Sequence, residues 1–453
     1  MALLPDPANE VMDLSRAWRF MLLHDHTYRA AISERAAART EFNQGRAGLF
    51  PQIQLSYSRS KIRGSATQPN MQGQRVTSDL DFDSSNSSIN LRQPLLNYGS
   101  YAGYKRGSAL AHQGDAVFDV KHQEAGLRLA GAYFNVLLAH EDVVLQQSLT
   151  ASLENMARAV EIQYQLSEGT RTDVQETQAR LAVARADVID AENQLVLTSR
   201  QLQALLSIPP TRIATLRTDF PLPPLTPLSL TDWQDRARIN NASVQAARQA
   251  VNVADAEVDQ AASRYLPTLD LVAAVGKADS ENLATLSQRS NTFTVGIQVN
   301  IPIFTGGYTT ADVSRARFER SRLQHELTAA HERTQAEVAR HYTNVRGGAE
   351  RIEALESTVE SSALTLGSAL RGYELGAWST LDVLRAQDNL YQAKYELTRA
   401  RLEYLQARLS LSAAVGDLQS GAFDEINHVF LGPVIALDSP HGTKAPGENI
   451  FLK

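Results

Sequence analysis

The stretch from Leu381 to Ala414 carries two interleaved sets of residues, each repeating every seven positions. The first set is Val383, Leu390, Leu397, Tyr404 and Leu411, and the second is Ala386, Ala393, Ala400, Ala407 and Ala414. An apolar seam of period seven is typical of helices that wind around each other in a left-handed supercoil. Because alanine is small, the second set lets a partner backbone approach closely. We therefore expect one long helix that packs tightly against its neighbours.

The same seam occurs earlier in the chain. Its two sets there are Val174, Leu181, Val188, Leu195 and Leu202, and Thr177, Ala184, Ala191, Thr198 and Leu205. Similar short motifs precede both seams: Tyr-Gln-Leu then Thr-Asp-Val-Gln within 164–175, and Tyr-Glu-Leu then Leu-Asp-Val-Leu within 373–384. The chain is therefore an internal duplication. We divide it into a first repeat at 1–207, a proline-rich linker at 208–231, a second repeat at 232–416 and a C-terminal segment at 417–453.

Composition excludes several classes of function. A net charge of −6 with 21% charged residues argues against a nucleic-acid partner, which needs a basic face. With no cysteine there is no disulfide framework, thiol nucleophile or lipid-anchored cysteine in this sequence. No apolar run is long enough for a transmembrane helix. Met1 to Pro7 lacks the basic start and apolar core of a signal peptide, so we expect either a cytosolic protein or a mature form.

No residue pattern indicates an enzyme. The chain has no Ser-His-Asp pattern, P-loop or dinucleotide-binding glycine motif, and we expect no cofactor. Its histidines lack the i, i+4 spacing with a carboxylate that is typical of zinc sites, so we expect no metal. The histidines considered are His24, His26, His325, His331 and His341.

Each repeat is predicted to hold a helix, a β-hairpin, a long helix, a turn and a seam helix. The helices before the hairpins are expected at Asp13–Gly48 and Trp233–Arg264, and the hairpins at 51–96 and 267–303. Within the hairpins we expect polar loops at Ser60–Ser88 and Lys277–Asn291. Long helices should follow from Ser100 to Gln165 and up to Tyr373, with tip turns at 166–173 and 374–382. Ile208 to Pro227 holds six prolines and cannot be helical, and the part after Gly416 reads as irregular with a frayed end.

The strands alternate apolar and polar residues, as in Ile53, Leu55 and Tyr57, and most clearly from Phe293 to Ile301. Four strands are too few to close a barrel. If three chains each gave four strands, a twelve-stranded barrel would close with its apolar face outside, as in outer-membrane barrels. Aromatic residues cluster where strands meet helices and would form one membrane-interface belt: Phe50, Tyr98, Tyr101, Tyr104, Tyr265, Phe304 and Tyr308. The alternative is the rim of a soluble β-sandwich.

These features together resemble the TolC family of outer-membrane efflux proteins, from about Asp13 to Leu418. The motifs are Leu-Phe-Pro and Tyr-Leu-Pro entering a strand, Pro-Ile-Phe-Thr-Gly-Gly leaving one, and Gly-x5-Asp-Val-Leu at a helix turn. The resemblance implies an α+β membrane protein: a homotrimeric β-barrel in outer-membrane lipid, continued by a long α-helical coiled-coil barrel through the periplasm. It also implies a mixed equatorial region from the N-terminal segment, the linker and the tail. The implied partners are a periplasmic adaptor (membrane fusion) protein and an inner-membrane ABC or RND transporter.

The resemblance also assigns roles at the periplasmic tip. It places Asp382 in an acidic ring, whereas Arg385 stands where some members carry a second acidic residue. Thr172, Asp173 and Tyr373 match positions that hold the tip shut, and Trp378 replaces a basic partner. Plainer alternatives stay open: Asp382 as a helix-capping carboxylate like Asp173, Arg385 as a solvated charge, and Trp378 as a wedge in its turn.

The leading hypothesis is a passive, gated export duct whose tip opens by a shift between two packings of the seams. Since the chain lacks a lipid-anchor cysteine, it looks more like the branch of the family that serves type I secretion. A multidrug efflux duct of the same family is the alternative. A soluble coiled-coil scaffold is the alternative from another class, and it predicts a protein that is soluble without detergent.

Overall fold

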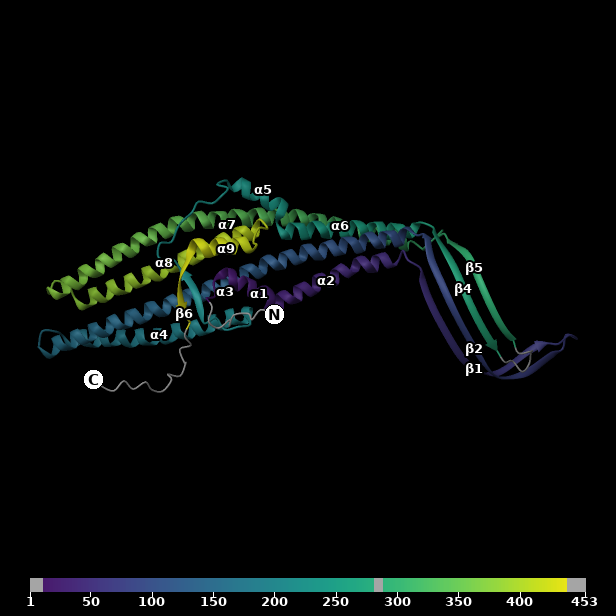
Figure 1. Cartoon of the computed structure of the whole chain (residues 1–453), viewed down its shortest axis with the longest axis horizontal. Helices are drawn as coiled ribbons and strands as arrows, with labels where there is room; N and C mark the ends of the chain where they lie inside the picture. The colour runs from purple at the N-terminus through teal and green to yellow at the C-terminus, as the bar shows by residue number, and fades with distance from the viewer. Residues whose placement is uncertain (1–10, 281–287, 438–453) are drawn as a thin grey trace, which may run out of the picture. The chain divides into compact units, whose positions relative to one another are not determined.

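The computed structural model describes residues 11–280 and 288–437 (Figure 1). The start at Met1–Pro7, the tail end that is predicted to fray and the centre of the second predicted loop lie outside the described residues. The chain forms two compact units. The helical unit holds Met1–Ser33, Val117–Gln245 and Ala329–Lys453, and the sheet unit holds Glu34–Ala116 and Ala246–Thr328. Each unit thus contains segments of both sequence repeats, and the division of the chain at 207, 231 and 416 stays a prediction.

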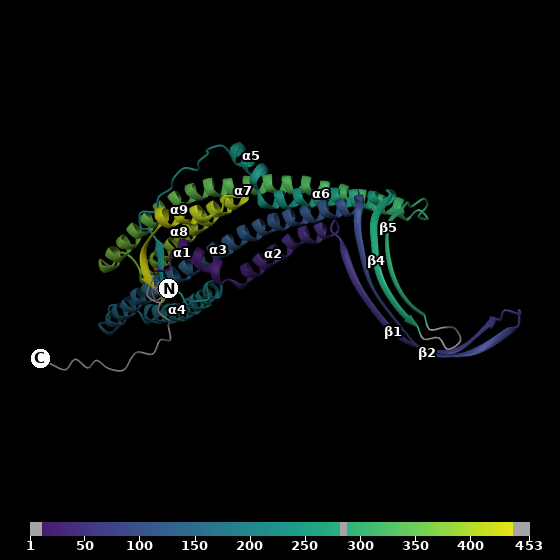
Figure 2. The same ribbon diagram turned by 45° about the vertical axis from the view of Figure 1, so that its right-hand side comes forward.

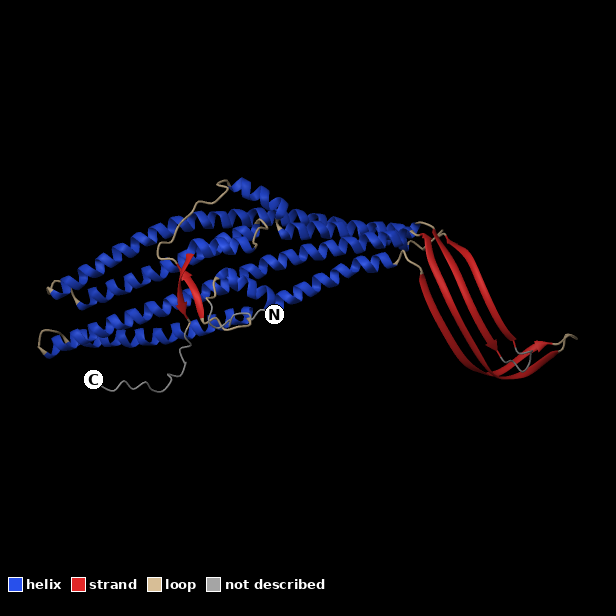
Figure 3. Cartoon of the chain, viewed as in Figure 1, coloured by secondary structure: helices blue, strands red, loops and turns tan. Residues whose placement is uncertain are grey.

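Most of the chain is helical (Figure 3). The helices are α1 Leu14–His24, α2 His26–Ala47, α3 Tyr98–Gln165, α4 Arg171–Leu206, α5 Leu230–Asn240, α6 Ala242–Ala262, α7 Tyr308–Glu374, α8 Thr380–Ala414 and α9 Ser420–Phe430. The two long helices, α3 and α7, have 68 and 67 residues, and neither contains a proline. The predicted long helices and seam helices are therefore confirmed. In the described part of the chain, no helix has the combination of length and apolarity needed to cross a bilayer.

Two predicted helices are each broken once, which the periodicity did not indicate. Asp25 separates α1 from α2, and its side chain accepts a hydrogen bond from the Thr27 amide at 3.0 Å. Asn241 separates α5 from α6; its Oδ1 accepts from the Val244 amide at 3.0 Å and its Nδ2 donates to the Ala414 carbonyl at 2.8 Å. Short polar side chains satisfy free amides at a helix start, so each break begins a new helix.

The sheet unit contains a four-stranded antiparallel sheet in the order β1-β2-β4-β5. Its strands are β1 Gln52–Pro69, β2 Arg75–Leu96, β4 Thr268–Ser280 and β5 Gln288–Asn300. The polar loops predicted at Ser60–Ser88 and Lys277–Asn291 are therefore wrong over most of their length. Backbone hydrogen bonds hold the ladder whatever the side chains are, so polar composition did not indicate a loop. The first turn is tight: Asn70 Oδ1 accepts from the amides of Gln72 and Gln74, and Gly73 adopts a φ of +79°.

The helical unit also contains a small sheet in which β3 Arg212–Leu216 pairs with β6 Leu431–Ala436. Met12 adds a bridge to Ile213, so three segments distant in sequence meet there. Ile208 to Pro227 is non-helical as predicted, but its strand was missed, and α5 begins within the predicted linker, at Leu230. The irregular structure predicted after Gly416 is wrong for α9 and β6. With only 11 residues, α9 is too short for its apolar spacing to stand out, although Phe423, Ile426 and Phe430 are buried.

The core of the helical unit is built from aromatic contacts and from the predicted seams. Trp18 of α1 stacks on Phe423 of α9 with a centroid distance of 4.8 Å. The buried Tyr133 hydroxyl donates to the Ala214 carbonyl at 2.8 Å, which fixes β3 onto α3. Most predicted seam positions are buried in α4 and α8: Val174, Thr177, Ala184, Ala191, Leu195, Thr198, Leu202, Val383, Ala386, Ala393, Ala400, Tyr404, Ala407, Leu411 and Ala414.

Candidate functional site

The turns between α3 and α4 and between α7 and α8 end in the same capping box. In the first, Thr170 Oγ1 lies 2.6 Å from Asp173 Oδ2, and the Asp173 amide donates back to Oγ1 at 3.1 Å. In the second, Ser379 Oγ donates to Asp382 Oδ2 at 2.6 Å and accepts from the Asp382 amide at 3.2 Å. Such reciprocal bonds satisfy two free amides at each helix start. Within one chain both aspartates are the third residues of capping boxes whose N-caps are Thr170 and Ser379, and the ring position of Asp382 stays a prediction.

Hydrogen bonding stabilises the charged form of Asp382. The Ser379 hydroxyl and then the Ser379 amide lower the pKa of this carboxyl, and the charge of Arg385 adds to the effect. Arg385 itself is exposed and forms no ion pair with any other described residue. The turn therefore presents one fixed carboxylate and one unpaired guanidinium.

Trp378 is packed into its own turn. Its indole lies on Gly372 so closely that a Cβ at that glycine would be 2.6 Å from Trp378 Cδ1. The Trp378 amide also donates to the Gly372 carbonyl at 3.2 Å, while Gly376 takes a φ of +71°. Trp378 is 42% exposed, so it supports the turn and is still partly open to solvent.

Polar contacts near the turns connect the two repeats. The Tyr373 hydroxyl donates to Gln163 Oε1 at 2.6 Å, which joins the end of α7 to the end of α3. Arg180 of α4 pairs with Asp388 of α8 at 2.5 Å. Thr172 is exposed, and no hydrogen bond joins it to Tyr373 in the described residues.

Sequence reasoning missed Gln163, Arg180 and Asp388. Opposite charges that flank heptad seams commonly pair across helices, and this signal was present in both seam helices. Beneath these contacts lies a small apolar core from α3, α4, α7 and α8: Leu153, Met156, Val160, Val174, Ala184, Ala369, Val383, Leu384 and Ala386.

The predicted aromatic residues lie at the junctions of strands and helices in the sheet unit. Tyr98, Tyr101 and Tyr104 lie in one row at the start of α3, with centroid distances of 6.1 and 6.3 Å. The guanidinium of Arg264 lies over Tyr308 at 5.4 Å, and the Tyr265 hydroxyl is 2.8 Å from Thr310 Oγ1. Phe50 and Phe304 are 52% and 88% exposed. Their role as a membrane-interface belt stays a prediction.

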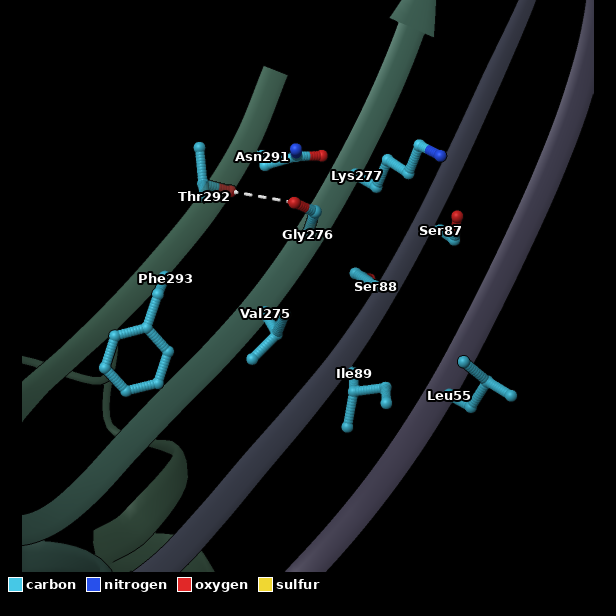
Figure 4. Close-up of a pocket in the computed structure, with 10 residues that line it drawn as sticks. All are labelled: Leu55, Ser87, Ser88, Ile89, Val275, Gly276, Lys277, Asn291, Thr292 and Phe293. Carbon is cyan, nitrogen blue, oxygen red and sulfur yellow. Dashed lines mark hydrogen bonds between the residues drawn. The ribbon is translucent and has the colours of Figure 1, made fainter. Parts of the chain in front are cut away.

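Where all four strands pair, the sheet has one apolar face, and that face is exposed. Leu55, Ile89, Val275 and Phe293 form a row across all four strands (Figure 4). Their exposed fractions are 70%, 47%, 52% and 74%. The next row belongs to the opposite face and is polar or small: Ser56, Ser88, Gly276 and Thr292. The edge strands β1 and β5 have no further partner among the described strands, so the sheet is open at both sides.

The described residues contain no group of three or more histidine, aspartate or glutamate side chains that could hold a metal ion. The histidines weighed from the sequence therefore do not gather with carboxylates in this part of the chain.

Comparison with known proteins identifies the family. The model of the family described as "Outer membrane efflux protein" matches residues 21–207 and 233–417. The alkaline protease secretion protein AprF of Pseudomonas aeruginosa is 34% identical over 90% of this chain and 85% of its own. The proteases secretion protein PrtF of Dickeya chrysanthemi is 31% identical over 90% of this chain and 89% of its own.

A solved structure shows the same fold. The outer membrane protein VceC of Vibrio cholerae matches with a TM-score of 0.74 at 18% identity, over 90% of this chain and 97% of its own. The family model covers both repeats, so the resemblance stated from the sequence is confirmed. The chain belongs to the outer membrane efflux protein family and is an export channel protein of the bacterial outer membrane.

Proposed function

We propose that three copies of this chain assemble into one duct, with their sheets closed into a twelve-stranded barrel in outer-membrane lipid. The observation that carries this proposal is the open sheet with an exposed apolar face. An open edge and a large apolar face are both unfavourable in water. Joining β1 of one copy to β5 of the next removes the edges, and lipid covers the apolar side. The exposed junction aromatics would then lie at the lipid–water interface.

The proposed partners are a periplasmic adaptor protein and an inner-membrane ABC or RND transporter, which supplies the energy. The proposed cargo is protein, exported by type I secretion. This choice is supported by two relatives above 30% identity that are both named as protease secretion proteins. A small-molecule efflux duct is the second candidate, because the description of the matching family names efflux. Loss of protease export with unchanged drug tolerance in a deletion strain would favour the first.

The proposed gate is the pair of helix turns of the helical unit, where Asp382 of three copies would converge. Two influences then oppose each other. Capping by Ser379 lowers the pKa of the carboxyl, while repulsion among converging carboxylates raises it. A ring that stays charged would attract cations. Arg385, Trp378, Tyr373, Thr172 and Asp173 would shape this end of the duct, and opening would shift a population between two helix packings.

The test is single-channel conductance of the detergent-purified protein in a planar bilayer, with a trivalent cation added on the side of the turns. We expect small cation-selective currents that the trivalent cation blocks. Asp382→Ala should weaken this block. Asp173→Ala removes the matching capping box in the other repeat and should leave the block intact. Equal effects of the two substitutions would contradict an Asp382 ring.

The same preparation separates the duct from a soluble scaffold. A duct requires detergent for solubility and forms a trimer. A protein that stays soluble and monomeric without detergent would refute the assembly itself.

A further inference from the structure

The two hairpins of the sheet differ in length. β4 and β5 have 13 residues each, whereas β1 and β2 have 18 and 22. The pairing of β2 with β4 ends at Ser84 and Ser280, but β1 and β2 continue to pair as far as Pro69 and Arg75. Figures 1 and 2 both show the end of β1 and β2 curving away beyond β4 and β5. We refer to residues 59–85 as the distal hairpin.

The apolar face of the sheet does not continue along the distal hairpin. The register of β1 on β2 has no shift over its whole length, so alternate residues stay on the same face throughout. That face carries Ile53, Leu55 and Tyr57 at first, and then Arg59, Lys61 and Arg63. Two aspartates of β2 lie on the same face: Arg59 pairs with Asp83 at 2.8 Å, and Lys61 and Arg63 pair with Asp81 at 3.4 and 3.5 Å. This face of the distal hairpin is charged and suited to contact with water.

The opposite face changes in the reverse sense. Near the helices it carries polar residues such as Ser56 and Ser58, whereas in the distal hairpin it becomes apolar. The apolar residues there are Ile62, Ala66, Val76, Leu80 and Phe82. Ile62 lies directly opposite Phe82, and Gly64 lies opposite Leu80 with no atom near the position of its absent Cβ. Ile62 and Val76 are 38% and 48% exposed. The hydrophobic side of the hairpin therefore switches faces at about residue 59.

This switch points to a partner on the inner side of the barrel. In the proposed trimer, the face with Ile53 and Leu55 contacts lipid, so the opposite face, with Ser56 and Ser58, lines the lumen. The apolar patch of the distal hairpin continues this lumenal side beyond the end of β4 and β5. Exposed apolar surface in water is stabilised by contact with other apolar surface. By threefold symmetry, the apolar surfaces that reach this patch across the lumen are the same patches of the other two copies.

We propose that the distal hairpins of three copies converge over the outer mouth of the barrel, where Ile62, Leu80 and Phe82 of each copy pack together into an apolar constriction. This inference rests on the proposed trimeric duct. The charged pairs of Arg59 and Lys61 stay on the solvent side of the closure. Its contacts involve few residues per chain, so cargo passing outward can separate them. The duct thereby has a second closure in addition to the one proposed at the turns.

Cysteine cross-linking of the assembled trimer tests the contact, because the chain has no cysteine of its own. Phe82→Cys places a thiol in the patch, and Ser85→Cys places one on the solvent side as the matched control. Under mild oxidation we expect most Phe82→Cys chains to form reducible dimers on a denaturing gel and Ser85→Cys chains to stay monomeric. Equal cross-linking of the two variants in a protein that is trimeric by size would overturn the closure but leave the duct intact. Failure to trimerise would overturn both.

A second measurement tests the constriction itself. Thr294→Cys lies on the polar face of β5 and serves as a lumenal reporter for a bulky hydrophilic maleimide added to whole cells. Adding Ile62→Ser and Phe82→Ser should accelerate its labelling several-fold, whereas adding Ser85→Ala should not. Unchanged labelling after the two serine substitutions would refute an apolar closure.

Discussion

The sheet and the helix turns differ in how much of their apolar surface is buried within one chain. At the turns, Ala369, Val383 and Leu384 are completely buried by helices of the same chain. In the sheet, Val295, Ile297 and Val299 are 57%, 67% and 58% exposed, and no described segment covers them. The turns thus bury part of their apolar surface within one chain, while Leu166 and Leu375 stay 64% and 84% exposed. In the proposed duct, lipid covers the apolar face of the sheet and further copies cover its edges.

The largest effect is expected at the apolar face of the sheet, where the most apolar surface is exposed. Ile297→Arg places a charge where lipid is expected, at a cost of about 2–4 kcal/mol per chain near the bilayer centre. We expect loss of trimer from the outer-membrane fraction. Gln298→Arg introduces the same charge on the other face and should be tolerated. Equal loss in both variants would mean that the apolar face does not contact lipid.

An intermediate effect is expected where the turn is most tightly packed. Gly372→Ala drives a Cβ to within 2.6 Å of the Trp378 ring, and overpacking of this kind costs about 1–3 kcal/mol. Gly367→Ala on the same helix places its Cβ 3.9 Å from a flexible arginine and should instead stabilise α7 by up to about 1 kcal/mol. The thermal unfolding midpoint of the purified protein distinguishes the two. A stabilising Gly372→Ala would show that the indole moves away freely.

The smallest effect on stability is expected at the polar contacts between repeats. Arg180 and Asp388 are partly exposed, so their ion pair contributes about 0.2–1 kcal/mol. Arg180→Ala should nevertheless raise the single-channel open probability, because it releases α4 from α8. Arg185→Ala removes a pair with Glu154 that joins α3 and α4 of the same repeat, and it should not. Equal open probabilities in the two variants would show that gating does not depend on this contact between the repeats.

Much of this molecule could be predicted from its sequence because its elements are long and periodic. The seams of α4 and α8, the two proline-free helices and the proximal halves of the strands each repeat a pattern many times, and local periodicity is then decisive. The capping aspartates, Asp173 and Asp382, were recognisable because capping is a contact across three residues. The order of these elements, twice over, was sufficient to indicate the family.

The tertiary structure decided the features that depend on residues far apart in the sequence. The short strands β3 and β6 gain stability by pairing with each other and, at Ile213, with Met12, and the short helix α9 gains it by packing on α1. The distal hairpin has its polar and apolar faces exchanged relative to the proximal part of the strands. Its polar composition was therefore interpreted as a loop. Its strands are held by one continuous backbone ladder that joins β1 to β2, and polar residues can occupy such a ladder because its hydrogen bonds join backbone groups.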